Sequence, residues 1–156
     1  MSDLLVNLLK LPELSATTTE IGSDVLIRRA QPFELSQTRS FVETEFSGSW
    51  ADEVSVGFAN KPVSVFVATQ NRALVGFAAY ECTRRAFFGP MGVINDRRNC
   101  GIGKALLLAC LWGLREMGYV YGVIGGAGPV HFYQNAVGAI VIPNSEPGIY
   151  TDLLRS

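Results

Sequence analysis

The stretch DRRNCGIGKALLLA, residues 96–109, places two arginines and two closely spaced glycines directly before an apolar run. From Gly101 to Met117 the apolar residues recur at helical spacing, and Gly118 follows as a residue suited to the position just past a helix end. The pattern therefore predicts a helix over residues 101–117. The glycines and the fixed positive charges gather at its first turn.

The start of this helix is suited to bind an anion. The first N–H groups of a helix have no intrahelical partner, and the macrodipole adds about half a positive charge there. Gly101 and Gly103 carry no Cβ, so a ligand can approach the backbone closely. Arg97, Arg98 and Lys104 add full charges nearby. Two interpretations follow: a pyrophosphate site, or a strand-to-helix turn that uses glycine for geometry and carries solvated arginines.

Two familiar phosphate-binding patterns do not fit this stretch. The ATP-binding pattern GxxxxGK[ST] fails because Ala105 follows the lysine and one residue separates the glycines. The dinucleotide pattern GxGxxG fails because its third glycine position holds Leu106. The pattern that does fit is Arg98-x-x-Gly101-x-Gly103.

The composition limits what kind of protein this is. The chain has 156 residues, of which 48% are apolar and 17% charged, as expected of one globular domain. Its net charge of −1 offers no one-signed surface for a nucleic acid or an anionic membrane, so an anion site must be local. Three cysteines at spacings typical of neither a zinc site nor a redox pair predict no metal site. Without a recognisable signal peptide, a cytoplasmic location is expected.

The first fifteen residues, MSDLLVNLLKLPELS, are apolar but are interrupted by Asn7, Lys10 and Pro12. The stretch is too short to span a bilayer. We expect an amphipathic element that docks on the body of the protein or on a second subunit. The expected organisation is therefore an N-terminal extension over residues 1–23 and a single domain over residues 24–156.

The remaining pattern predicts an α/β or α+β sandwich, with helices on both faces of a mixed, mostly antiparallel sheet. The expected strands cover residues 25–32, 63–69, 73–81, 86–94, 119–126 and 139–142. The expected helices cover residues 34–47, 51–60, 101–117 and 128–138, with Gly48–Trp50 as a break and residues 143–156 as a C-terminal cover.

Two segments resemble one known family. The run GVINDRRNCGIGKALL resembles the acetyl-CoA signature of the GNAT superfamily of N-acetyltransferases, [Q/R]xxGx[G/A] after a strand ending in Val, with Val93 at the usual spacing. The run FYQNAVGA, residues 132–139, is similar to the family's second signature, an aromatic–Tyr pair followed by Gly at the end of a short helix. The order of expected elements also matches over residues 24–142. The resemblance implies a GNAT-like sheet that is splayed at the acyl-CoA site.

The resemblance implies acetyl-CoA as co-substrate, no metal, and direct attack of an amine on the thioester without an acyl-enzyme. The end of the strand at Met91–Val93 would pair with the pantetheine arm, and the Val93 N–H would polarise the thioester carbonyl. Pro90 and Gly92 are consistent with a sheet that opens there. The implied cofactor-binding residues are Met91, Gly92, Val93, Arg97, Arg98, Asn99, Cys100, Gly101, Ile102, Gly103, Lys104, Ala105, Gly126, Phe132 and Tyr133.

Tyr133 is the candidate general acid for the departing thiolate. The alternative is a core aromatic, because Tyr133 shares helical spacing with Phe132, Ala136 and Val137. The sequence departs from the family at Gly126, where Asn is common, and at Ala139, where an aromatic is common. The glycine-rich stretch around Gly126 is a candidate for close backbone approach to the pantetheine or the substrate.

No general base is evident in the sequence. Glu81 is the first candidate, and Asp52 and Glu53 are the others, although each is compatible with a solvated surface charge. His131 is expected at the surface. Cys100 is expected to fill space beside the anion site, since direct transfer needs no thiol.

The resemblance implies an acceptor pocket built by the first two helices, the loop between them and the later strands. Here that loop region is residues 43–54, where carboxylates surround Trp50, and the expected acceptor is a small-molecule amine. Helix 101–117 is apolar over more than one face, which either a homodimer or cover by the N-terminal segment would explain. Two other functions remain open: a non-catalytic acyl-CoA-binding or sensor module, and a nucleotide-phosphate binding protein that uses the same anion site.

Overall fold

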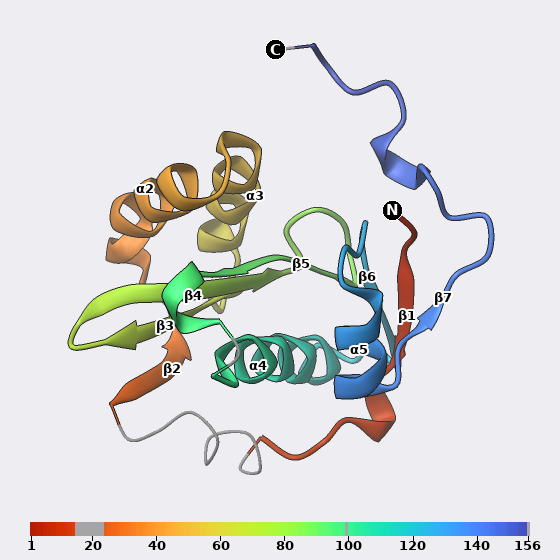
Figure 1. Ribbon diagram of the computed structural model, residues 1–156, viewed down its shortest axis with the longest axis horizontal. Coiled ribbons are helices and arrows are strands. Elements are labelled where there is room, and N and C mark those ends of the chain that lie inside the picture. The colour runs from red at the N-terminus through yellow and green to blue at the C-terminus, as the bar shows by residue number, and fades with distance from the viewer. Residues whose placement is uncertain (15–23, 99, 156) are drawn as a thin grey trace.

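The computed structural model describes residues 1–14, 24–98 and 100–155, and within them it contains one seven-stranded mixed sheet with helices on both faces (Figure 1). The strands are β1 (Leu4–Asn7), β2 (Val25–Arg29), β3 (Val65–Gln70), β4 (Ala73–Tyr80), β5 (Phe87–Val93), β6 (Tyr121–Ile124) and β7 (Ile140–Val141). Their order is β2-β3-β4-β5-β6-β1-β7, and β5 and β6 form the parallel pair. The expected mixed, mostly antiparallel sheet is confirmed.

Four helices cover the sheet. Helices α2 (Leu35–Glu45) and α3 (Gly48–Ala59) lie on one face, and α4 (Ile102–Glu116) and α5 (Val130–Val137) lie on the other. Short 3-10 turns at η1 (Leu8–Lys10), η2 (Pro32–Glu34), η3 (Asn95–Arg97) and η4 (Gly148–Tyr150) connect or follow these elements. Two buried clusters result, a larger one under α4 and a smaller one under α2 and α3.

Strands β2 to β5 form the expected antiparallel meander. The β3–β4 hairpin turns at Asn71 and Arg72, which both have positive φ (52° and 67°). Two consecutive residues with positive φ match the right-handed twist of the flanking strands. This local chemistry sets the register of the strand ends next to the turn, and the register then shifts between Ala68 and Thr69.

The break between the first two helices lies earlier than expected. Residues Gly48–Trp50 form the first turn of α3, because Ser47 acts as its N-cap and accepts a hydrogen bond from the Trp50 N–H at 3.2 Å. The glycine was expected to interrupt the helix, but the cap makes it the first helical residue. This start places Trp50 and Glu53 beside residues 87–91 of β5, with which they line a common pocket.

The N-terminal segment contributes a strand to the sheet at Leu4–Asn7, where an amphipathic element docked on the body was expected; residues 15–23 of the expected extension lie outside the described residues. Strand β1 lies between β6 and β7 and is antiparallel to both. Leu4, Val6 and Leu8 are completely buried. A four-residue strand is too short for periodicity to separate it from a helix, and its partners lie more than a hundred residues away.

The N-terminal segment also explains the apolar circumference of α4. Trp112 donates its indole N–H to the Pro12 carbonyl at 2.9 Å, and Arg115 reaches the Leu8 carbonyl at 3.3 Å. Leu108 and Leu111 are completely buried within the single chain. Of the two explanations, cover by the N-terminal segment is therefore the one seen, and the helix supplies no argument for a dimer. Among the described residues, no helix is long and apolar enough to cross a membrane.

Candidate active site

A gap opens between β5 and β6 where the two strands separate. They pair at Phe87↔Val123 and Phe88↔Ile124 and at no later residue of β5. Gly89 has φ of +121°, and the β4–β5 register shifts between Ala78 and Tyr80, so the path of β5 changes at this point. The expected splay of the sheet is therefore confirmed.

The backbone of β5 presents N–H groups to this gap. The Ile94 N–H donates to the Val75 carbonyl at 3.0 Å, which makes that pair a hydrogen-bonded one in the antiparallel ladder. In an antiparallel ladder, hydrogen-bonded pairs alternate with pairs whose backbone N–H and C=O groups point away from the partner strand. Val93, which lies opposite Gly76, and Met91 belong to the second kind, so their N–H groups point away from β4. The N–H groups expected to contact an acyl-CoA thus lie on the open side of the strand.

The first turn of α4 presents backbone, as its glycines predicted. Gly101 is the N-cap residue with φ of +84°, and the side chains of Ile102 and Ala105 are buried in the core. A Cβ built on Gly103 would lie 3.8 Å from its nearest neighbour, the Phe132 ring, so the surface of this residue is open. Gly101 and Gly103 therefore offer backbone and no side chain to a ligand, whereas the Ala105 N–H already donates to the Gly101 carbonyl at 3.1 Å.

The charged and flanking residues of this turn are arranged less uniformly. Arg97 donates Nε–H to Gln70 Oε1 at 2.6 Å, whereas exposed Arg98 donates Nε–H to the Val93 carbonyl at 3.3 Å. Arg98 is thus the arginine that lies against the exposed edge of β5. Cys100 is exposed and Lys104 half-buried, and Asn99 lies outside the described residues. No group of three potential metal ligands occurs among the residues that the structure describes.

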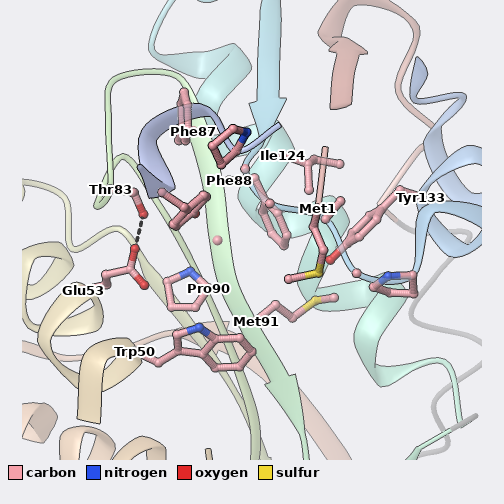
Figure 2. Close-up of a pocket in the computed structure, with 18 of the residues that line it drawn as sticks. Met1, Trp50, Glu53, Thr83, Phe87, Phe88, Pro90, Met91, Ile124 and Tyr133 are labelled. Carbon is pink, nitrogen blue, oxygen red and sulfur yellow. Dashed lines mark hydrogen bonds between the residues drawn. The ribbon is translucent and has the colours of Figure 1, made fainter. Parts of the chain in front are cut away.

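A pocket of about 520 Å³ occupies the end of the gap (Figure 2). Its walls come from α3, the β4–β5 connection, β5, the loop after β6, α5 and the C-terminal segment. Figure 2 shows Glu53 and Thr83 at one end and Tyr133 at the other, with Pro90 and Met91 between them. Segments that are distant in the sequence therefore meet around one cavity.

Tyr133 lies in the wall of this pocket with 7% of its surface exposed. Its ring packs edge-on against Phe88 and Phe132, with centroids 6.2 Å and 5.1 Å apart. Burial raises the pKa of the Tyr133 phenol to about 12, so the hydroxyl keeps its proton at neutral pH. The ring belongs to the core, as one sequence interpretation predicted, and the residue also lines the cavity; its role as general acid stays a prediction.

Glu81 lies outside the pocket and has a structural role. Its Oε2 accepts a hydrogen bond from the Ala86 N–H at 2.7 Å, and its Oε1 accepts one from the Tyr119 hydroxyl at 2.8 Å. Glu81 has φ of +58°, and these bonds hold the β4–β5 connection closed. The geometry therefore does not support Glu81 as the base.

The carboxylate that does line the pocket is Glu53. Thr83 donates its hydroxyl to Glu53 Oε1 at 2.6 Å, which fixes the side chain at the pocket wall. The neighbouring Asp52 is exposed and bonds Arg39 at 3.0 Å instead. One residue on a helix corresponds to about 100° of rotation, so the two carboxylates face different surroundings. The sequence offered both residues and no means of choosing between them.

The C-terminal segment supplies a wall that the sequence did not indicate. The Tyr150 ring packs on Gly126, where an added Cβ would lie 2.9 Å from the ring. Gly126 has φ of +52° and donates its N–H to Asp3 Oδ1 at 2.8 Å. The residue does line the pocket, but its missing Cβ makes room for Tyr150 and its N–H is already bonded.

Comparison with known proteins places this site in a family. Residues 61–136 match the family model of the acetyltransferase (GNAT) domain. Comparison with curated protein sequences found no match.

Solved structures with the same fold share low sequence identity with the chain. A GCN5-related glucosamine N-acetyltransferase region of a fungal multi-domain GH3 β-N-acetylglucosaminidase superposes with a TM-score of 0.71 at 17% identity, over 90% of this chain and 19% of that one. A GCN5-related N-acetyltransferase from Sphaerobacter thermophilus gives a TM-score of 0.62 at 18% identity, over 90% and 48%. A GNAT family acetyltransferase from Brucella melitensis, crystallised with acetyl-CoA, gives 0.58 at 21% identity, over 76% and 86%.

The sheet that opens between β5 and β6, with helices on both faces, gives the chain the fold that these GNAT structures share. More specifically, residues 61–136, just under half of the chain, match the model of the GNAT acetyltransferase domain, in agreement with the resemblance found in the sequence. The chain spans about a fifth and about half of the lengths of the first two structures, so what those whole proteins do is not carried over.

Proposed function

We propose that the chain is an N-acetyltransferase that transfers the acetyl group of acetyl-CoA directly to the primary amine of a small-molecule acceptor. One observation carries the proposal: the outward N–H groups of Met91 and Val93 face the gap beside the open first turn of α4. The extended pantetheine arm of acetyl-CoA can pair with β5 there like an extra strand, with its pyrophosphate at the start of α4.

The residues present fit acetyl-CoA. Backbone N–H groups from Gly101 to Lys104, with Arg98, hold the pyrophosphate, and the open surface of Gly103 allows close approach. The outward Val93 N–H stabilises the charge that develops on the thioester oxygen. The Brucella melitensis structure of the same fold was crystallised with acetyl-CoA, which supports this choice of donor.

The reaction needs no covalent enzyme intermediate. The uncharged amine nitrogen bonds to the acetyl carbon while the carbon–sulfur bond breaks and its electron pair leaves on sulfur. The ammonium form of the acceptor loses two protons overall. One is released to solvent, and the other offsets the proton that the sulfur gains to become a thiol. The raised pKa of Tyr133 keeps its phenol protonated at neutral pH. The phenol therefore donates a hydrogen bond or its proton to the leaving thiolate, and a donated proton is replaced from solvent.

Ligand-dependent stability and thiol release test the proposal together. Acetyl-CoA or CoA at about 100 times its dissociation constant should stabilise the folded chain by roughly 2.7 kcal/mol, and ATP should not. Free thiol should then appear from acetyl-CoA when a primary amine is added. Stabilisation without thiol release from any amine would favour the non-catalytic acyl-CoA-binding module, and stabilisation by ATP alone would favour the nucleotide-phosphate binder.

A further inference from the structure

The pocket that Tyr133 lines is mostly apolar and carries a single charged side chain. Trp50, Phe87, Phe88 and Tyr150 supply aromatic surface, and Pro90 adds to it. The Phe46, Trp50 and Phe77 rings pack against one another behind this wall, with centroids 5.5 to 6.2 Å apart. The walls are therefore rigid as well as apolar, and a ligand that fills the 520 Å³ needs an apolar body.

One negative charge faces this apolar space. Glu53 is the only carboxylate among the described residues that line the pocket, and no Lys, Arg or His side chain lines it. The α-amino group of Met1 is ion-paired with Glu146. Within the described part of the chain, the Glu53 charge therefore has no cationic partner in the pocket.

The Glu53 carboxylate is held in place with one oxygen still available. Thr83 occupies Oε1 at 2.6 Å, and no described residue bonds Oε2. A primary ammonium carries three donors and pairs with a carboxylate as a compact charge. A carboxylate or phosphate on the ligand would meet Glu53 without any countercharge, which is costly in an apolar pocket.

We infer, on the basis of the proposed acetyl transfer, that the acceptor is a small monoamine with an apolar, ring-sized body and no acidic group. Glu53 binds its ammonium group and Thr83 positions Glu53. The aromatic walls hold the body of the acceptor and orient its nitrogen along β5 toward the thioester. Amino acids, amino sugars and polyamines fit this pocket poorly, because each brings polar or charged groups that the walls leave without partners.

A matched pair of amines tests the acceptor class. Phenylethylamine and phenylalanine differ by one carboxylate, so we expect kcat/KM for thiol release to be at least about 100-fold higher with phenylethylamine. Glucosamine and putrescine should be used no better than phenylalanine. If acetyl-CoA is bound but phenylalanine, glucosamine or putrescine is preferred, or no apolar amine is used, the inference is overturned.

A matched pair of variants tests the anchor. Glu53→Gln should raise KM for phenylethylamine by at least about tenfold and leave the dissociation constant of acetyl-CoA unchanged. Asp52→Asn removes the same charge from the preceding position of α3 and should change neither value, since Asp52 faces Arg39. Equal effects of the two variants, or none from Glu53→Gln, would refute the anchor. Failure of the wild-type protein to bind acetyl-CoA would instead refute the proposed function.

Discussion

The two ends of the site differ in which atoms they present to a ligand. The proposed cofactor end consists of backbone N–H groups from β5 and the first turn of α4, with Arg98 as its exposed charge. The acceptor end consists of side chains from α3, the β4–β5 connection, α5 and the C-terminal segment. The first end is contiguous in the sequence over residues 91–105, and the second is assembled from segments up to a hundred residues apart.

Because of this difference, we expect one end to control acetyl-CoA binding and the other to control which amine is used. A backbone surface depends on local conformation, so it tolerates many side chains but requires glycine at the close approach. A side-chain pocket depends on packing between distant elements, so a single residue can change its selectivity. We therefore expect substitutions at the cofactor end to change acetyl-CoA affinity, and substitutions at the acceptor end to change the use of the amine.

Tyr133→Phe should have the largest effect, because Tyr133 lies in the wall shared by the two ends. Turnover should fall by about 10²- to 10⁴-fold, the usual range for general acid catalysis, while the dissociation constant of acetyl-CoA stays nearly the same. Steady-state kinetics and calorimetry measure the two values. Tyr119→Phe is the control, since the Tyr119 hydroxyl bonds Glu81 outside the pocket. Unchanged turnover in Tyr133→Phe would exclude the acid role.

The buried Tyr133 phenol should also make stability depend on alkaline pH. Its pKa is about 12 in the folded chain against an ordinary value of 10, so both states are protonated below pH 10 and only the unfolded state ionises between pH 10 and 12. The free energy of unfolding should therefore fall over that range by roughly 2–3 kcal/mol more than in Tyr133→Phe. Urea unfolding at pH 9, 10 and 11 follows the change. Parallel curves for the two proteins would show that Tyr133 is not desolvated.

Arg98→Ala should weaken acetyl-CoA binding by about 10- to 100-fold, as the loss of hydrogen bonds to a charged group implies. The effect should shrink as salt is added, because Arg98 is exposed. KM for the amine should not change. Lys61→Ala removes an exposed cation from the α3–β3 connection and serves as the control. If both variants lost the same amount of acetyl-CoA affinity, the effect would come from the net charge of the protein and not from the position of Arg98.

Gly126→Ala should have the smallest effect and should act only at the acceptor end. Its positive φ costs about 1 kcal/mol of stability on substitution, and the new Cβ displaces the Tyr150 ring from the pocket wall. KM for the amine should rise several-fold while acetyl-CoA affinity is kept. Gly138→Ala shares the positive φ but has open space around it, so it should lose stability alone. Matching kinetics in the two variants would rule out a role for Tyr150.

Several features were accessible from local sequence because they rest on local chemistry. The β3–β4 turn, helix α4, its glycine-led start and the termination of α5 at Gly138 all follow from residues next to one another. The N-terminal strand did not, since Leu4 and Val6 pair with residues of β6 far along the chain. Glu81 and Glu53 were both candidates, because a sequence does not tell which carboxylate a cavity will include.

The sequence by itself was enough to predict the cofactor end, from the spacing of Arg98, Gly101 and Gly103 and the start of the helix that follows them. Backbone conformation and helix polarity are properties of short segments, so a short segment is enough to predict them. Only the tertiary structure decided the acceptor end. Glu53, Tyr133 and Tyr150 come to line one pocket because α3, α5 and the C-terminal segment pack around residues 87–91 of β5, and that packing depends on the burial of side chains from the whole chain.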